Sequence, residues 1–252
     1  MRVLLPPSET KRSGGSSAFA LEQLTFPALL QRRRTLRDAV VTLAADREAS
    51  ARALKLGPRQ LDEILRNADL LTAPGMSAVD RFDGVLYEAL DAASLSEQER
   101  VSLGRRVLIQ SALWGPIGAL DAIPAYRLSH DSRVPGISLK RWWADAAGEV
   151  LATLSGLVLD LRSEAYAALG PLMFSETRWF VRVRSRDSDG QLRNLNHVNK
   201  KSKGLFVRAL VQDGVAATTL AELMGWADGR GFELTRGRSA HELDLIIAEN
   251  KI

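Results

Sequence analysis

Short apolar runs alternate irregularly with longer amphipathic segments along this chain, and that pattern constrains the fold most. Short runs bounded by Gly, Pro and Asn predict buried strands, whereas apolar residues spaced three and four apart predict helices. Because the two types of segment do not alternate strictly, we predict an α+β fold, with a mixed β-sheet wrapped by helices, rather than an ordered βαβ series. At 252 residues the chain can bury a full core, and we expect a single domain over residues 1–252.

These patterns give the expected positions of individual elements. The expected strands are residues 3–5, the apolar run 107–109, residues 157–161, 232–235 and 243–248, and a hairpin of residues 179–186 and 192–198 around Asp189-Gly190. The expected helices are residues 29–54, 58–68, 78–90 with an interruption at Gly84, 96–104, 139–154, 205–212 and 219–227.

Composition indicates a globular protein and excludes several kinds of chemistry. Hydrophobic residues make up 46% of the chain and charged residues 25%, which is typical of folded domains. The lack of cysteine excludes disulfides, thiolate metal sites and thiol nucleophiles, and it fits a reducing compartment, so we expect a cytoplasmic location. The start of the chain lacks the apolar length of a signal peptide, and the apolar stretch 150–161 is too short and too interrupted to cross a membrane.

A basic segment, residues 196–204, carries the strongest functional signal. Lys200, Lys201 and Lys203 crowd together beside Gly204, and three ammonium groups repel one another unless an anion or water separates them. We expect a helix to begin at Gly204, where backbone N–H groups and the helix dipole favour phosphate or carboxylate. The alternative is a solvated basic loop. The net charge of +4 permits a polyanionic partner without identifying one.

Three other groups of residues each have a structural and a functional interpretation. The run Arg32-Arg33-Arg34 either grips phosphates or forms a solvated helix turn, and the second is favoured. Trp114 and the pair Trp142-Trp143 either stack on bases or pack in the core, and the core is favoured. The three histidines of the chain show no ligand spacing, so we predict no metal site.

Six short motifs are distributed along nearly the whole chain. They are Leu4-Leu5-Pro6-Pro7-Ser8-Glu9-Thr10-Lys11, Gly84-Val85-Leu86-Tyr87, Ser111-Ala112-Leu113-Trp114-Gly115, Ile123-Pro124-Ala125-Tyr126-Arg127-Leu128, Asp160-Leu161-Arg162-Ser163 and Asn199-Lys200-Lys201-Ser202-Lys203-Gly204. In their order and spacing the chain resembles the YaaA family of peroxide stress proteins, and within it an actinobacterial branch. Six motifs in register are far more specific than any one of them.

The resemblance implies a cytoplasmic protein with the mixed α/β fold peculiar to that family, which limits iron-driven oxidative damage under hydrogen peroxide. It also implies DNA binding through a basic cleft with a helix-hairpin-helix-like element. Because the sequence has a basic segment but no recognition helix rich in base-reading side chains, we expect weak binding of double-stranded DNA without sequence preference.

Two features of this chain weaken that implied cleft. The turn at Gly84 is the candidate hairpin, but Asp80 and Asp83 beside it oppose phosphate, so a structural turn is favoured. Gly118-Ala119 stands where the family usually has an Arg-Pro pair, which removes a bidentate phosphate donor. Either the ligand differs here, or another base such as Arg133 replaces that contact.

The candidate site residues come from several motifs, and we expect residues 7–11, 114–127 and 200–204 to converge. On a strand Tyr126 and Arg127 face opposite ways, and Arg127 is the one expected to face the site. Asp121 and Ser111 either take part in chemistry or serve as caps and turn residues. The expected anion- or DNA-binding residues are Lys11, Arg127, Lys200, Lys201, Lys203 and Gly204, and the possible pocket residues are Ser8, Glu9, Ser111, Asp121, Tyr126, His197 and Asn199.

Motifs of common enzymes are absent: the chain has no Gly-x-Gly-x-x-Gly, no Walker Gly-Lys-Ser/Thr, no nucleophile elbow and no His-Glu-x-x-His. Two functions stay open. The first is a stress protein that binds DNA through a basic cleft. The second is an enzyme of unknown reaction that clamps a small anionic substrate with Lys11, Arg127 and Lys203, while Asp121 or Glu9 transfers a proton. No cofactor is predicted, and the oligomeric state stays open.

Overall fold

The computed structural model describes residues 1–186, 192–193 and 196–246, with the side chains of these residues except for 185–198. The strands are β1 (Arg2–Leu5), β2 (Met76–Ser77), β3 (Val107–Ser111), β4 (Gly115–Gly118), β5 (Ala122–Ile123), β6 (Val158–Asp160), β7 (Arg178–Arg186), β8 (Leu192–Arg193), β9 (Glu233–Arg236) and β10 (Glu242–Ile246). The helices are α1 (Leu30–Ala44), α2 (Arg47–Leu54), α3 (Glu63–Ala68), α4 (Ala78–Arg81), α5 (Val85–Leu90), α6 (Glu97–Arg106), α7 (Leu139–Ala152), α8 (Glu164–Ala167), α9 (Asn196–Gln212) and α10 (Leu220–Gly229).

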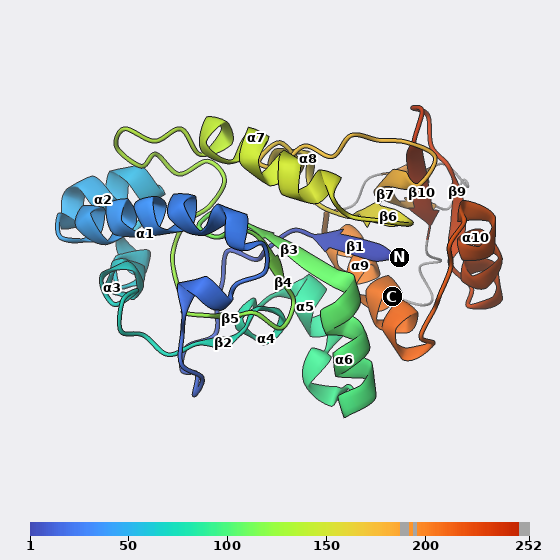
Figure 1. Ribbon diagram of the computed structural model, residues 1–252, viewed down its shortest axis with the longest axis horizontal. Helices are drawn as coiled ribbons and strands as arrows, with labels where there is room; N and C mark the ends of the chain where they lie inside the picture. Colours follow the sequence, from blue (N-terminus) through green and yellow to red (C-terminus); the bar gives the residue numbers. More distant parts are fainter. Residues whose placement is uncertain (187–191, 194–195, 247–252) are drawn as a thin grey trace.

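A mixed sheet runs through the molecule with helices on both faces (Figure 1). Its strand order is β4-β3-β1-β6-β7-β10-β9, and β8 pairs with the end of β7. The strands from β3 to β10 in this order are parallel to one another, whereas β4 and β9 pair antiparallel at the two edges. The α+β fold with a mixed sheet wrapped by helices is therefore confirmed.

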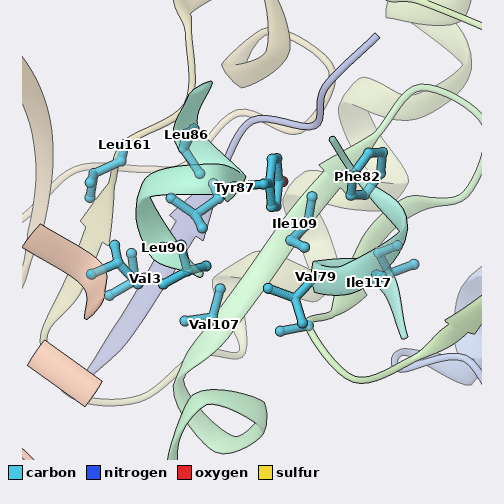
Figure 2. Packing of buried hydrophobic residues seen from close by; sticks show 14 of the residues in the cluster. Val3, Val79, Phe82, Leu86, Tyr87, Leu90, Val107, Ile109, Ile117 and Leu161 are labelled. Carbon is cyan, nitrogen blue, oxygen red and sulfur yellow. The ribbon is translucent and has the colours of Figure 1, made fainter. Parts of the chain in front are cut away.

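Strand β1 shows how the sheet separates two layers of apolar side chains. Side chains alternate between the faces of a strand. Val3 and Leu5 enter the larger core cluster, which includes Leu86 of α5, whereas Leu4 packs with Leu151 of α7 in a second cluster. Figure 2 shows the α5 side chains against Val3 and the neighbouring strand β3.

Helix boundaries follow local capping chemistry where the sequence supplies it. The side chain of Ser96 accepts a hydrogen bond from the Glu99 N–H at 3.3 Å, and Glu99 accepts one from the Ser96 N–H at 2.7 Å, which forms a capping box at the start of α6. At the start of α10 the side chain of Thr219 accepts a hydrogen bond from the Glu222 N–H, and the Glu222 carboxylate accepts one from the Thr218 N–H. Among the described residues no helix is long and apolar enough to cross a membrane.

The expected start of the basic helix is wrong. Helix α9 begins at Asn196, so it includes residues 196–198, which we expected in a strand, and it places Gly204 in mid-helix. The β7–β8 pairing, with Ser185 opposite Arg193, agrees with the expected hairpin, but its turn at Asp189-Gly190 lies outside the described residues. The helix extends because Lys203, Val207 and Leu210 share one buried helical face.

The interpretation of Arg33 as a phosphate grip or a solvated residue is also wrong. Its side chain is fully buried. The guanidinium donates to the carbonyl oxygens of Trp114 at 2.8 Å, Pro116 at 2.9 Å and Thr25 at 2.7 Å. Burial lowers the pKa of Arg33 to about 10. Arg33 therefore joins α1 to Thr25 and to the segment that carries β4.

The carboxyl ends of β1, β3 and β6 lie at one edge of the sheet, because the three strands are parallel neighbours. Ligands of open α/β sheets bind at such edges. Buried polar side chains gather at this edge, among them Ser111 at the end of β3 and Asp160 at the end of β6. The loop after β1 also starts here, and it carries Lys11.

Candidate functional site

Lys11 lies buried in the loop that follows β1, with only 3% of the residue exposed. Its Nζ donates to the carbonyl oxygen of Glu9 at 3.0 Å and lies 4.1 Å from the ring centroid of Tyr126. A bridge between Lys11 and Phe82 fixes the loop against the turn that precedes α5. Burial, and then the charge of Arg127, lowers the pKa of Lys11 to about 7. The amine is therefore poised to lose its proton near neutral pH.

Arg127 faces the same loop. Its Nη2 donates to Glu9 Oε2 at 3.1 Å, and 11% of its side chain is exposed. The side-chain amide of Asn67 holds the backbone of Arg127 in place, because it donates to the carbonyl oxygen and accepts from the N–H, both at 2.8 Å. A pocket of about 150 Å³ opens beside Arg127, lined by Thr10, Arg59, Gln60, Asp62 and Glu63.

Tyr126 and Arg127 both contact the loop after β1, which corrects the expectation that only one of them faces the site. Strand β5 ends at Ile123, so the alternation of a strand does not govern these two residues. The Tyr126 hydroxyl lies 2.7 Å from Ser111 Oγ, which also accepts from the N–H groups of Leu113 and Trp114. Burial raises the pKa of Tyr126 far above its ordinary value. Ser111 therefore anchors a turn and orients Tyr126.

Asp121 is a turn anchor in this structure. Its carboxylate accepts from the N–H and hydroxyl of Thr25 at 2.8 and 2.9 Å, and from the N–H of Gly118 at 2.9 Å. A Cβ on Gly118 would lie 2.7 Å from the Thr25 hydroxyl and 2.9 Å from Asp121. The space at Gly118 is thus already taken by this network, which accounts for a glycine at the position. Arg133, the suggested replacement base, is exposed.

The turn at Gly84 docks on the same loop. Gly84 has a φ of 120°, which favours glycine, and a Cβ there would lie 3.1 Å from Ser8 Oγ. The N–H of Asp83 donates to the carbonyl oxygen of Thr10 at 3.1 Å, and its carboxylate pairs with Arg12 at 3.4 Å. These contacts match the structural turn that the sequence favoured.

The basic segment divides into exposed and buried members. Lys200 is exposed and Lys201 half-buried, whereas only 7% of Lys203 is exposed. Burial lowers the pKa of Lys203 to about 8, against the opposing effect of Asp160. Asn199 is half-buried on α9, and the side chain of His197 lies outside the described part of the chain.

Gly204 serves helix packing rather than anion binding. A Cβ at this position would lie 2.2 Å from the carbonyl oxygen of Leu86 and 2.8 Å from the Cβ of Ala89, both on α5. Only a residue without a side chain allows α9 to approach α5 this closely. The expected helix N-terminus at Gly204 therefore does not exist, and the anion site proposed there is not supported.

A buried ion pair at the end of β6 was missed as a site feature. Asp160 receives hydrogen bonds from Nε and Nη2 of Arg162 at 2.8 and 2.6 Å, and Arg162 Nη1 donates to Gln110 Oε1 at 3.0 Å. These residues are at most 2% exposed. The sequence signals were an Asp-x-Arg at the end of an apolar strand and the motif Asp160-Leu161-Arg162-Ser163, neither of which was assigned to the site. The positive charge of Lys203 also attracts the Asp160 carboxylate.

The three segments that we expected to converge do so in part. Residues 7–11 and 114–127 meet through the contacts of Glu9 and Lys11. The segment 200–204 reaches α5 through Gly204, and α5 in turn reaches the loop after β1, because the Tyr87 hydroxyl donates to the carbonyl oxygen of Pro6 at 2.8 Å. The charged groups that act on Lys203, however, are Asp160, Arg182 and Lys200. In the described part of the chain, no group of three or more His, Asp or Glu side chains is placed to hold a metal ion.

Comparison with known proteins agrees with the sequence motifs. Residues 1–237 match the family model described as "Peroxide stress protein YaaA". A UPF0246 protein of Corynebacterium glutamicum is 38% identical over 98% of this chain and 100% of its own length. A UPF0246 protein of Streptomyces coelicolor is 36% identical over 99% of both chains, and one of Limosilactobacillus fermentum is 26% identical over 89% of this chain and 92% of its own length.

Proposed function

Since this chain belongs to the YaaA family of peroxide stress proteins, we propose that it limits iron-driven oxidative damage by binding double-stranded DNA. The observation that carries the proposal is the exposed Lys200 on α9, directly after an arginine-rich stretch. Residues 182–203 hold seven Lys or Arg residues against two Asp residues, and of the seven Lys203 is buried and Arg182 is paired with Glu164 and Glu242. Such a concentration of positive charge attracts the phosphate backbone without reading sequence.

The proposed contact set is smaller than the sequence suggested. Lys11, Arg127 and Lys203 are mostly buried, and Arg127 is already paired with Glu9. A duplex reaches exposed side chains and not buried ones. We therefore assign the phosphate contacts to the exposed Lys200 and the half-buried Lys201 beside it, and exclude the buried bases from them.

Salt-dependent binding to a short duplex tests the proposal. Each phosphate contact contributes about 0.9 to the slope of log K against log salt, so Lys200→Ala/Lys201→Ala lowers the slope by about 1.8. The control Lys140→Ala/Arg141→Ala removes the same charge from exposed positions on α7 and leaves the slope nearly unchanged. Equal slopes for both double variants would remove Lys200 and Lys201 from the interface.

A plasmid-nicking assay with ferrous iron and hydrogen peroxide connects binding to protection. The wild-type protein reduces nicking at low salt, and the Lys200→Ala/Lys201→Ala variant protects less than the Lys140→Ala/Arg141→Ala control. Protection that is equal in both variants would separate the protective activity from this DNA contact.

Lys11 favours a second candidate function, the binding of a small anionic substrate or ligand. A buried amine with a pKa of about 7, close to the Arg127 guanidinium and a small pocket, is typical of sites that bind or transform small anions. Inorganic phosphate is a simple probe. If it raises the melting temperature of the wild-type protein but not that of Arg127→Ala, this second function is supported; no shift in either protein counts against it.

A further inference from the structure

A separate cavity has a volume of about 490 Å³. Its walls are α8 and the loop after it, strand β7, and the turn between β9 and β10. It shares no lining residue with the pocket at Arg127. Its volume is that of small-molecule sites in general. No function discussed above uses it.

One wall of this cavity is apolar and includes two aromatic rings. Phe174 and Phe180 meet edge to face with their centroids 6.3 Å apart, and Ala168 and Leu172 extend the wall. Phe174 is 42% exposed and its neighbour Met173 is 79% exposed. Large apolar side chains exposed beside a cavity mark a surface suited to an apolar ligand.

Beside this wall the cavity is rich in hydrogen-bond acceptors, and the Arg182 guanidinium lies 5.2 Å from the centroid of the Phe180 ring. Arg182 donates to Glu242 at 2.8 Å and to Glu164 at 2.7 Å, and Arg184 Nη2 lies 3.9 Å from Glu242 Oε1. The third lining carboxylate, Asp160, is already bound by Arg162. The charge of Lys203 interacts electrostatically with Asp160 and Arg182, but Lys203 does not line the cavity. A carboxylate oxygen accepts more than one hydrogen bond, so Glu164 and Glu242 retain acceptor capacity.

His241 adds an imidazole ring to the lining. It lines the cavity, and its Nδ1 is buried without a hydrogen-bond partner among the described residues. Its backbone φ is 60°, a left-handed conformation that residues other than glycine seldom adopt and that often marks functional sites. A buried polar atom without a partner is unfavourable unless a ligand or water satisfies it.

We propose that this cavity binds a small amphiphilic amine, with an apolar ring against Phe174 and Phe180 and a protonated amino or amidino head at Glu164 and Glu242. The apolar wall fits the ring. The excess of acceptors over donors selects a head that donates hydrogen bonds and carries positive charge, and it disfavours a carboxylate head.

Isothermal titration of the full-length chain with tryptamine and indole-3-acetate tests the proposal, because the two probes share one ring and differ in the charge of the head. We expect tryptamine to bind one molecule per chain with a Kd at least about tenfold lower than that of indole-3-acetate, a difference typical of one favourable charged contact. Equal affinity, tighter binding of the acid, or no binding of either probe to folded protein would overturn the proposal.

Variants locate the bound probe. Glu164→Gln removes one charge from an exposed side chain and is expected to weaken tryptamine about tenfold, whereas Glu97→Gln, an exposed position on α6 outside the cavity, leaves the affinity unchanged. Ala168→Trp fills the apolar end and abolishes binding. Phe174→Ala serves as a second test should the larger substitution prevent folding, and it weakens the binding of tryptamine. Tryptamine binding that is insensitive to Glu164→Gln and Phe174→Ala would place the probe elsewhere.

Discussion

Substitution of Gly204 by alanine tests the close contact between α5 and α9. The new Cβ would lie 2.2 Å from the carbonyl oxygen of Leu86, and relief to an ordinary contact distance of 3.4 Å requires a shift of 1.2 Å. The obstacle is backbone, so it cannot rotate away as a side chain does. Overpacking of this kind destabilises by about 1–3 kcal/mol, and we place Gly204→Ala near the upper end.

Alanine also favours the helix by about 1 kcal/mol relative to glycine, which leaves a net loss of about 2 kcal/mol. For a chain of this size that corresponds to a drop of roughly 4–8 °C in the melting temperature. Urea denaturation measures the free energy of unfolding, and an unchanged m-value shows that the folded state keeps its compactness.

The matched control is Gly225→Ala in α10. Gly225 is exposed, and a Cβ there meets no atom within 4 Å. The control therefore measures the effect of helix propensity alone, and we expect it to raise the free energy of unfolding by up to about 1 kcal/mol. If Gly204→Ala is as stable as Gly225→Ala, the two helices do not approach as closely as described, and the argument for the glycine fails.

Two further predictions concern buried charges. The pKa of Lys11 is lowered from its ordinary 10.5 to about 7, so the unfolded chain binds this proton more tightly, and the charged amine destabilises the fold fully below about pH 7. The stability gained by Lys11→Met over wild type is therefore greatest below about pH 7 and declines as the pH rises toward 10.5. A difference in the free energy of unfolding that is constant from about pH 6 to 10 contradicts the lowered pKa. Asp160→Asn leaves the Arg162 guanidinium buried without its counter-charge and lowers the free energy of unfolding by about 3–5 kcal/mol in urea denaturation; a loss below 1 kcal/mol would show that the pair is not buried in solution.

Local chemistry explains which parts of the fold were predictable. The strand at residues 3–5 is an apolar run, and the start of α6 has the Ser96 and Glu99 capping box, so both can be identified from neighbouring residues alone. The start of α9 has no such signal, because its first residues are polar and its helical face becomes apolar only where it packs on α5. Helix propensity gives way to tertiary packing in such segments.

The site depends on contacts between distant parts of the chain, which a single sequence does not display. Lys11 is buried because Phe82 and Tyr126 close over it, and the three residues belong to different segments. Arg33 looked like part of an exposed basic run because two of its carbonyl partners, Trp114 and Pro116, follow it by 81 and 83 residues. Side-chain type could identify Lys11 and Arg127 as site candidates, but only the fold separates them from the exposed Lys200.

The position of β1 in the sheet determines how long this strand stays unpaired during synthesis. Both neighbours of β1 lie far downstream, since β3 begins at residue 107 and β6 at residue 158. Proteins are synthesised at about 5–20 residues per second, so the backbone groups and apolar side chains of residues 2–5 wait for many seconds on the ribosome before either partner strand exists. During that interval β1 is available to chaperones and to other nascent chains alike. This interior strand of the sheet is thus made well before either of its partners.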